Sequence, residues 1–136
     1  FAALADEDVA LGGMVLAVNM VTPGLASSQS GEVGDVVAAT LRVLGATVPV
    51  AVAGVAFLSG EHEERIATER LCAMNKTMPR RRPWPLTFDY GRATEHTAES
   101  LLHRLRCNGL AACGAYTSKI EDLADLAGAR VPRIAA

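Results

Sequence analysis

The feature that most constrains the fold is an alternation of short apolar runs with segments of helical spacing. The apolar runs lie at about residues 14–20, 48–58 and 86–90, and Gly, Pro or Ser bounds each of them. Short apolar runs bounded in this way are typical of buried strands. Because a helical segment follows each run, the order predicts right-handed βαβ units and a parallel sheet of three strands.

The helical segments follow the strands in turn. Hydrophobic residues recur every three or four positions over 32–44, and Gly45 then predicts the end of that helix. Similar spacing predicts helices over 61–75 and over 94–116, and a weaker one over 120–126.

Two closed architectures contain this order of elements: a doubly wound sheet and part of a (β/α)8 barrel. The pattern alone does not choose between them. No G-x-G-x-x-G motif follows any of the three strands, which weakens the case for a dinucleotide-binding sheet. The chain has 136 residues, enough for one compact domain, whereas a complete barrel takes about 250.

The charge inventory excludes some classes of partner. Thirteen basic and 15 acidic residues give a net charge of -2, whereas nucleic-acid-binding domains usually carry a basic excess. The one dense basic cluster, Arg80 to Arg82, has no aromatic residues interleaved and is expected to be a solvated loop. No apolar run reaches the roughly 18 residues of a membrane span.

The cysteines predict free thiols in a reducing compartment, so a cytoplasmic protein is expected. Cys72, Cys107 and Cys113 are odd in number and show no paired spacing. Zinc-binding spacings are absent, and His96 and His103 lie on a polar run rather than in a ligand pattern. We therefore expect no metal site and no cofactor.

The ends of the second and third strands predict an anion site. Ligands of parallel α/β folds meet the carboxyl ends of the strands. Ser59 and Gly60 lead from the second strand directly into a helix, whose N-terminus attracts anions. Arg92, after Gly91 at the next strand end, offers a guanidinium to the same anion. The alternative is that Ser59 and Gly60 only cap the helix and that Arg92 is a surface charge.

The sequence shows no reaction centre beside this anion site. The only lysines, Lys76 and Lys119, lie at a helix end and in a late loop, so neither is expected to project from a strand. Asp89 lies in the third strand without an evident partner. Neither paired carboxylates at strand ends nor a Ser–His–Asp order is present.

Five segments resemble class I fructose-bisphosphate aldolase in their order and spacing. They are VNMVTPG (18–24), VPVAVAGVAFLSG (48–60), AMNK (73–76), PWPLTFDYGRA (83–93) and LAACGAY (110–116). The resemblance implies a (β/α)8 TIM barrel of which residues 1–136 would form the C-terminal part, its last three βα units. It also implies a cytoplasmic, homotetrameric glycolytic lyase. Such an enzyme cleaves fructose 1,6-bisphosphate reversibly to dihydroxyacetone phosphate and glyceraldehyde 3-phosphate through a lysine Schiff base.

The resemblance assigns roles to particular residues. Ser59, Gly60, Gly91 and Arg92 match family positions that hold a substrate phosphate, in agreement with the anion site inferred from the strand ends. Glu61 departs from the pattern, because the family commonly has a second glycine there, and its charge would weaken phosphate binding.

A second departure removes the nucleophile. The family strand motif L-L-K-P-N-M reads VLAVNM over 15–20, so Ala17 stands at the position of the Schiff-base lysine. Imine formation requires a primary amine, and the chain is therefore expected to be inactive, keeping at most phosphate binding. The alternative is a non-catalytic binding or assembly module derived from the same fold; an unrelated sugar-phosphate-binding domain would require the resemblance to be accidental.

The sequence also predicts a fragment. It begins at Phe1, inside an apolar stretch that resembles the end of a helix. Three strands alone would leave both edges of the sheet open. We therefore expect the isolated chain to be marginally stable, to self-associate or to depend on a complementary piece.

Overall fold

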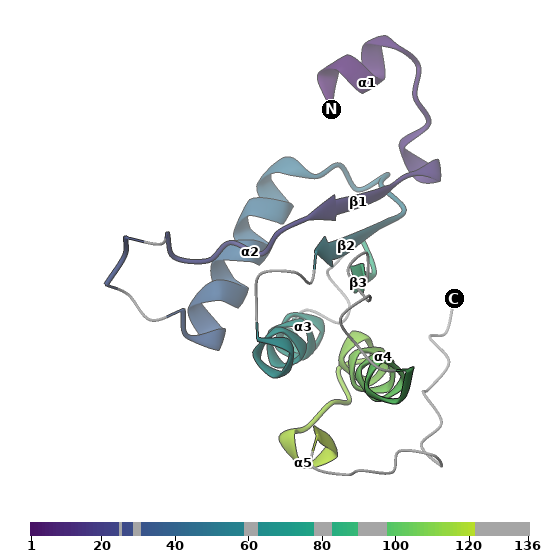
Figure 1. Ribbon diagram of the computed structural model, residues 1–136. Helices are drawn as coiled ribbons and strands as arrows, with labels where there is room; N and C mark the ends of the chain where they lie inside the picture. The colour runs from purple at the N-terminus through teal and green to yellow at the C-terminus, as the bar shows by residue number, and fades with distance from the viewer. Residues whose placement is uncertain (25, 29–30, 59–62, 78–82, 90–97, 122–136) are drawn as a thin grey trace.

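The computed structural model describes residues 1–24, 26–28, 31–58, 63–77, 83–89 and 98–121 (Figure 1). Helices and strands alternate through most of this range. In chain order the elements are α1 (Ala2–Asp6), the short 3-10 helix η1 (Leu11–Gly13), β1 (Val15–Val18), α2 (Val33–Thr47), β2 (Gly54–Leu58), α3 (Glu64–Thr77), β3 (Leu86–Asp89), α4 (Ala98–Ala112) and α5 (Ser118–Glu121).

The three strands form one parallel sheet in the order β1-β2-β3. This confirms the predicted α/β class with three parallel strands. Because side chains alternate along a strand, residues paired in register share a face of the sheet. One face carries the rows Leu16–Val55–Leu86 and Val18–Phe57–Phe88.

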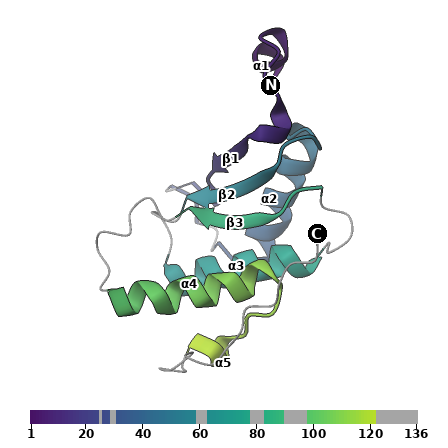
Figure 2. The same ribbon diagram turned by 90° about the vertical axis from the view of Figure 1, so that its right-hand side faces the viewer.

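Helices cover that face and make the core. Figure 2 shows α2, α3 and α4 on one side of the sheet, with α1 standing away from it. Phe57 is fully buried, and its ring meets that of Phe88 edge-on, with centroids 6.3 Å apart. Leu71 and Met74 of α3 are also fully buried, which is the burial that their helical spacing predicted. No helix in the described ranges is long and apolar enough to cross a membrane.

The second strand is shorter than predicted. It begins at Gly54 rather than at Val48, and residues 49–52 form a turn closed by a bond from the Val52 N–H to the Pro49 carbonyl, 3.1 Å. Pro49 has no N–H to donate to a ladder. Its carbonyl also accepts a bond from the indole Nε1 of Trp84, 2.8 Å. Because of this proline and this tertiary contact, residues 49–52 form a turn although their sequence is an apolar run typical of a strand.

Gly45 does not end α2, so that prediction was wrong. The helix runs to Thr47, and the Val48 N–H still donates to the Leu44 carbonyl, 2.9 Å. The helix stops because Pro49 forces the residue before it into an extended conformation, as seen in the φ of -95° and ψ of 120° at Val48.

The fourth helix ends earlier than predicted, at Ala112 rather than near Tyr116. Gly114 adopts a φ of 69°, and its N–H donates to the Ala111 carbonyl. The Ala115 N–H donates back to Leu110 in the same turn. This is the Schellman arrangement that glycine favours. It turns the chain so that Tyr116 becomes buried outside the helix.

Candidate functional site

The face of the sheet opposite the helices carries no described helix, and Ala17 lies on this face in the edge strand β1. Ala17 pairs with Ala56, and Ala56 pairs with Thr87, so these three side chains form one row. Ala17 and Thr87 are both exposed. A methyl group therefore stands on the edge strand at position 17, where the resemblance places the Schiff-base lysine.

The rest of this open face is mostly apolar. Val15 is 61% exposed, and Leu58 is 41% exposed at the carboxyl end of β2. Leu58 pairs in register with Asp89, an exposed carboxylate at the end of β3. Among the described residues, the open face thus offers one hydroxyl and one carboxylate but no amine.

Both lysines lie in the helical layer. The Nζ of Lys76, at the end of α3, is 3.5 Å from the Tyr116 carbonyl oxygen and lines a shallow hollow between α3 and residues 116–118. Lys119 is exposed on α5. The prediction that neither lysine projects from a strand is confirmed, and the sheet separates both from Ala17.

The predicted phosphate ligands Ser59, Gly60, Gly91 and Arg92, together with Glu61, lie outside the described residues and stay predictions. The described flanks show where each segment begins. Leu58 ends β2, Asp89 ends β3, and the two are in register on neighbouring strands. Both segments therefore leave the sheet from adjacent points on the same edge, as an anion site shared between them requires.

A second feature of the chain, which the sequence analysis missed, is a buried polar cluster between α3, α4 and α5. We use the name Arg104 cluster for Arg104, Glu64, Thr68, Tyr116 and Glu121. Arg104 is only 9% exposed and donates through both terminal nitrogens to the Glu121 carboxylate, making a two-pronged ion pair.

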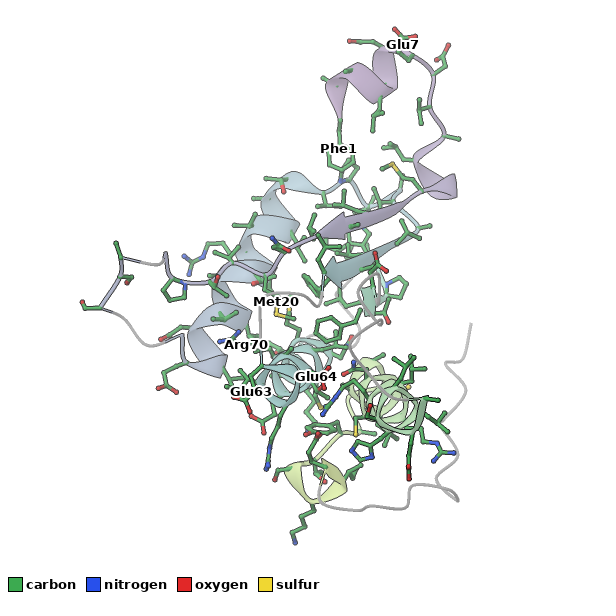
Figure 3. The ribbon with its side chains drawn as sticks, in the orientation of Figure 1. Phe1, Glu7, Met20, Glu63, Glu64 and Arg70 are labelled. Atoms are coloured by element: carbon green, nitrogen blue, oxygen red, sulfur yellow. The ribbon has the colours of Figure 1, made fainter. Side chains whose placement is uncertain are left out.

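Further bonds complete the Arg104 cluster. The Nε of Arg104 donates to Glu64 at 3.2 Å, and its Nη1 donates to Thr68 Oγ1 at 3.1 Å. The Tyr116 hydroxyl donates to Glu121 Oε2 at 2.7 Å. Figure 3 labels Glu64 at the start of α3. Arg104 of α4 thus hydrogen-bonds both to α3 and to α5.

The environment of the Arg104 cluster changes the pKa of its members. Burial alone would raise the pKa of Glu121, but hydrogen bonds from Arg104 and Tyr116 outweigh burial and lower it. Burial, together with the bond to Glu121, raises the pKa of the Tyr116 hydroxyl. Burial also raises the pKa of the neighbouring Cys107 thiol to about 11. At neutral pH Glu121 is therefore charged, and the phenol and thiol keep their protons.

A separate contact ties the segment after β1 to the helical layer. Arg70, on α3, is buried and donates through Nη2 to the Gly31 carbonyl at 2.7 Å. Met20, just after β1, is also buried, and Figure 3 shows it close to α3. These contacts position the chain that leaves the carboxyl end of β1.

Comparison with known proteins identifies the family. The family model described as class I fructose-bisphosphate aldolase, a glycolytic family, matches residues 1–131. That is nearly the whole chain. The chain belongs to the class I fructose-bisphosphate aldolase family.

Several aldolases show the relationship in detail. Human fructose-bisphosphate aldolase C is 41% identical over 137 aligned residues, covering 90% of this chain. Aldolase C-B of Danio rerio is 39% identical over 133 residues. The Plasmodium falciparum aldolase, solved in complex with TRAP and a small-molecule inhibitor, superposes with a TM-score of 0.75 at 38% identity and matches 87% of this chain.

The chain spans little more than a third of these aldolases, 37% of the human protein and 38% of the Plasmodium chain. The resemblance inferred from five sequence segments is confirmed, and an accidental likeness is excluded. Within this aldolase-related chain the strand position expected to carry the Schiff-base lysine is an exposed alanine on the open face.

The Arg104 cluster had only a faint signal in the sequence. Arg104 stands among Leu101, Leu105 and Leu110 on a helix that was predicted to be amphipathic, and a charge among apolar positions was its only mark. Its partner Glu121 is 17 positions away, in a segment expected to be a weak helix. No spacing rule connects the two.

Proposed function

We propose that this chain corresponds to the last three βα units of a class I aldolase barrel and that it does not carry out imine chemistry. The parent activity is the reversible cleavage of fructose 1,6-bisphosphate to dihydroxyacetone phosphate and glyceraldehyde 3-phosphate. One observation carries the proposal. Ala17 lies on the open face, in the edge strand β1, and among the described residues no lysine amine lies on that face.

The chemical argument is direct. A Schiff base forms when an unprotonated primary amine attacks the ketose carbonyl. The side chain of Ala17 has no amine, and Lys76 and Lys119 lie on the helical side of the sheet. A substrate held on the open face could reach neither lysine.

Phosphate binding is the function that this proposal leaves to the chain. Ser59 and Gly60 would present backbone N–H groups beside the start of α3, and Arg92 after Gly91 would supply the cation. Glu61 would place a negative charge beside the phosphate and weaken its binding. The site would take the phosphate of a triose phosphate or of fructose 1,6-bisphosphate, in a cytoplasmic protein.

Borohydride trapping tests the loss of imine chemistry. The chain is incubated with dihydroxyacetone phosphate and sodium borohydride, and its intact mass is measured, with a complete class I aldolase treated in parallel as the positive control. We expect an adduct on the complete enzyme and none on this chain. A stoichiometric adduct mapped to Lys76 or Lys119 would falsify the proposal, and variants with Gln at each position would identify the reacting amine.

A second candidate function is an assembly module, which the open face favours. Val15 and Leu58 expose apolar surface, and β1 and β3 each pair with one neighbour among the described strands. Exposed strand edges are templates for pairing with another chain, and the family's homotetramers set a precedent for association. Sedimentation velocity over a range of concentrations tests this. A concentration-dependent increase in mass is expected, and a monomer that melts cooperatively at every concentration would count against it.

A further inference from the structure

We propose that His103, Cys107 and Glu121 form a binding site for a transition-metal ion, with zinc as the best fit. Each residue offers one ligand atom, and the three atoms lie within 4.8 Å of one another. The Cys107 Sγ is 3.5 Å from the His103 Nε2, and that nitrogen is 3.9 Å from the Glu121 Oε1. This differs from the sequence-based expectation of no metal, which considered only neighbours along the chain.

The separation between sulfur and nitrogen matches tetrahedral zinc, and the other two separations are longer or less closely defined. Zinc binds thiolate sulfur at about 2.3 Å and imidazole nitrogen at about 2.0 Å, so two such ligands at a tetrahedral angle stand about 3.5 Å apart. The sulfur–nitrogen separation of 3.5 Å has this value. A carboxylate oxygen would stand about 3.4 Å from the nitrogen. The observed nitrogen–oxygen separation is 3.9 Å, and all three ligand atoms lie within 4.8 Å, so the side chains must draw closer together to bind one ion.

The backbone brings the three ligands together. His103 and Cys107 are four residues apart on α4, so they lie on the same face of that helix. Glu121, on α5, comes from the segment that the glycine turn after α4 folds back. One helix thus supplies two ligands, and the neighbouring element supplies the third.

The Arg104 cluster orients the carboxylate ligand. Arg104 and the Tyr116 hydroxyl both hydrogen-bond to Glu121, as outer partners commonly do for metal-ligating carboxylates. Charges also balance. Arg104 faces two carboxylates, those of Glu64 and Glu121, which leaves one negative charge. A divalent ion with the Cys107 thiolate adds one positive charge, and the thiol proton goes to solvent.

The donor set selects the class of metal. A thiolate, an imidazole and a carboxylate suit zinc and related ions rather than magnesium or calcium, which prefer oxygen ligands only. Cys107 is fully buried, whereas the His103 side chain is 26% exposed. An ion would enter past His103, and three protein ligands leave a fourth position for water.

Metal titration of the tag-free 136-residue chain tests the site. Zn²⁺ binding is measured by calorimetry, and Co²⁺ is added separately to detect the absorption band of a cobalt–thiolate bond. We expect one ion per chain and a cobalt–thiolate band. Cys107→Ala should abolish the band, and His103→Gln should weaken Zn²⁺ binding by at least the roughly 10–100-fold lost when an outer partner is removed.

Cys113→Ala is the matched control, because Cys113 lies outside the group of three ligand atoms. It should bind both ions as the unchanged chain does, and far-ultraviolet circular dichroism should show the same helix content in every variant. His103→Gln changes a partly exposed side chain, so its effect does not depend on the core. The proposal is overturned if no ion binds, if Cys107→Ala and His103→Gln bind normally, or if Cys113→Ala loses binding. In that case the three side chains form only a hydrogen bond and an ion pair.

Discussion

The two sides of the sheet differ in the polar groups that they carry. The difference is the reverse of what we would expect for a relative of the aldolases. The open face, where the family's chemistry would lie, presents Val15, Ala17 and Thr87 and has no amine among its described residues. The helical side instead holds Arg104, with two acidic partners at hydrogen-bond distance. The described polar contacts are therefore concentrated in the helical layer, and the described part of the open face carries a hydroxyl and a carboxylate but no amine.

The largest expected difference between the two sides is found within a single strand. Phe57 faces the helices and is fully buried, whereas Leu58 faces away and is 41% exposed. Phe57→Ala should lower the free energy of unfolding by about 3–5 kcal/mol, because it removes a core ring and leaves a cavity. Leu58→Ala should cost under about 1 kcal/mol. Urea unfolding followed by circular dichroism measures both; equal losses would mean that another surface covers the open face.

Arg104 provides the next largest effect. Arg104→Met should destabilise the chain by about 3 kcal/mol, because it leaves the Glu121 carboxylate buried without its cation. Arg42→Met, at an exposed position on α2, is the matched control and should change stability by less than about 0.5 kcal/mol. The same urea titration compares them. If Arg104→Met were as mild as the control, the Arg104 cluster would contribute nothing net to the helical layer.

The turn before β2 should give a smaller effect. Trp84→Phe keeps most of the buried ring but removes the bond from Nε1 to the Pro49 carbonyl. We expect a loss of about 1 kcal/mol, the net value of one hydrogen bond. Thermal unfolding measures it, with Trp84→Leu as a comparison that also reduces ring packing. A neutral Trp84→Phe would show that the bond from Nε1 to Pro49 contributes no net stability to this turn.

The smallest expected effect is at position 17, where the sequence resemblance places the Schiff-base lysine. Ala17→Lys places a side chain on an exposed position, so stability should change by less than about 0.5 kcal/mol. An exposed lysine amine stays largely protonated at neutral pH, and fructose 1,6-bisphosphate cleavage should not appear. A coupled assay for triose phosphate checks this, and activity above a heat-denatured control would show that the amine alone was missing.

Much of the fold was accessible from the sequence because its signals are local. Hydrophobic period and bounding residues located all three strands and the main helices. The errors at Pro49 and Gly45 came where a tertiary contact or a proline outweighed the period, and the error at the end of α4 came from the glycine turn at Gly114. The family followed from five short segments. The family model then confirmed it and extended the match to residues 1–131.

The sequence alone determined the order of elements, the family and the alanine at position 17, because each depends on residues near one another in the chain. The tertiary structure decided that both lysines lie across the sheet from Ala17 and that Arg104 meets Glu121. It also brought Glu121 to His103 and Cys107. The contacts of Glu121 depend on how the chain turns at Gly114 after α4 and on how α5 folds back. A periodic pattern cannot specify them, because packing between distant segments, not spacing along the chain, determines the distances.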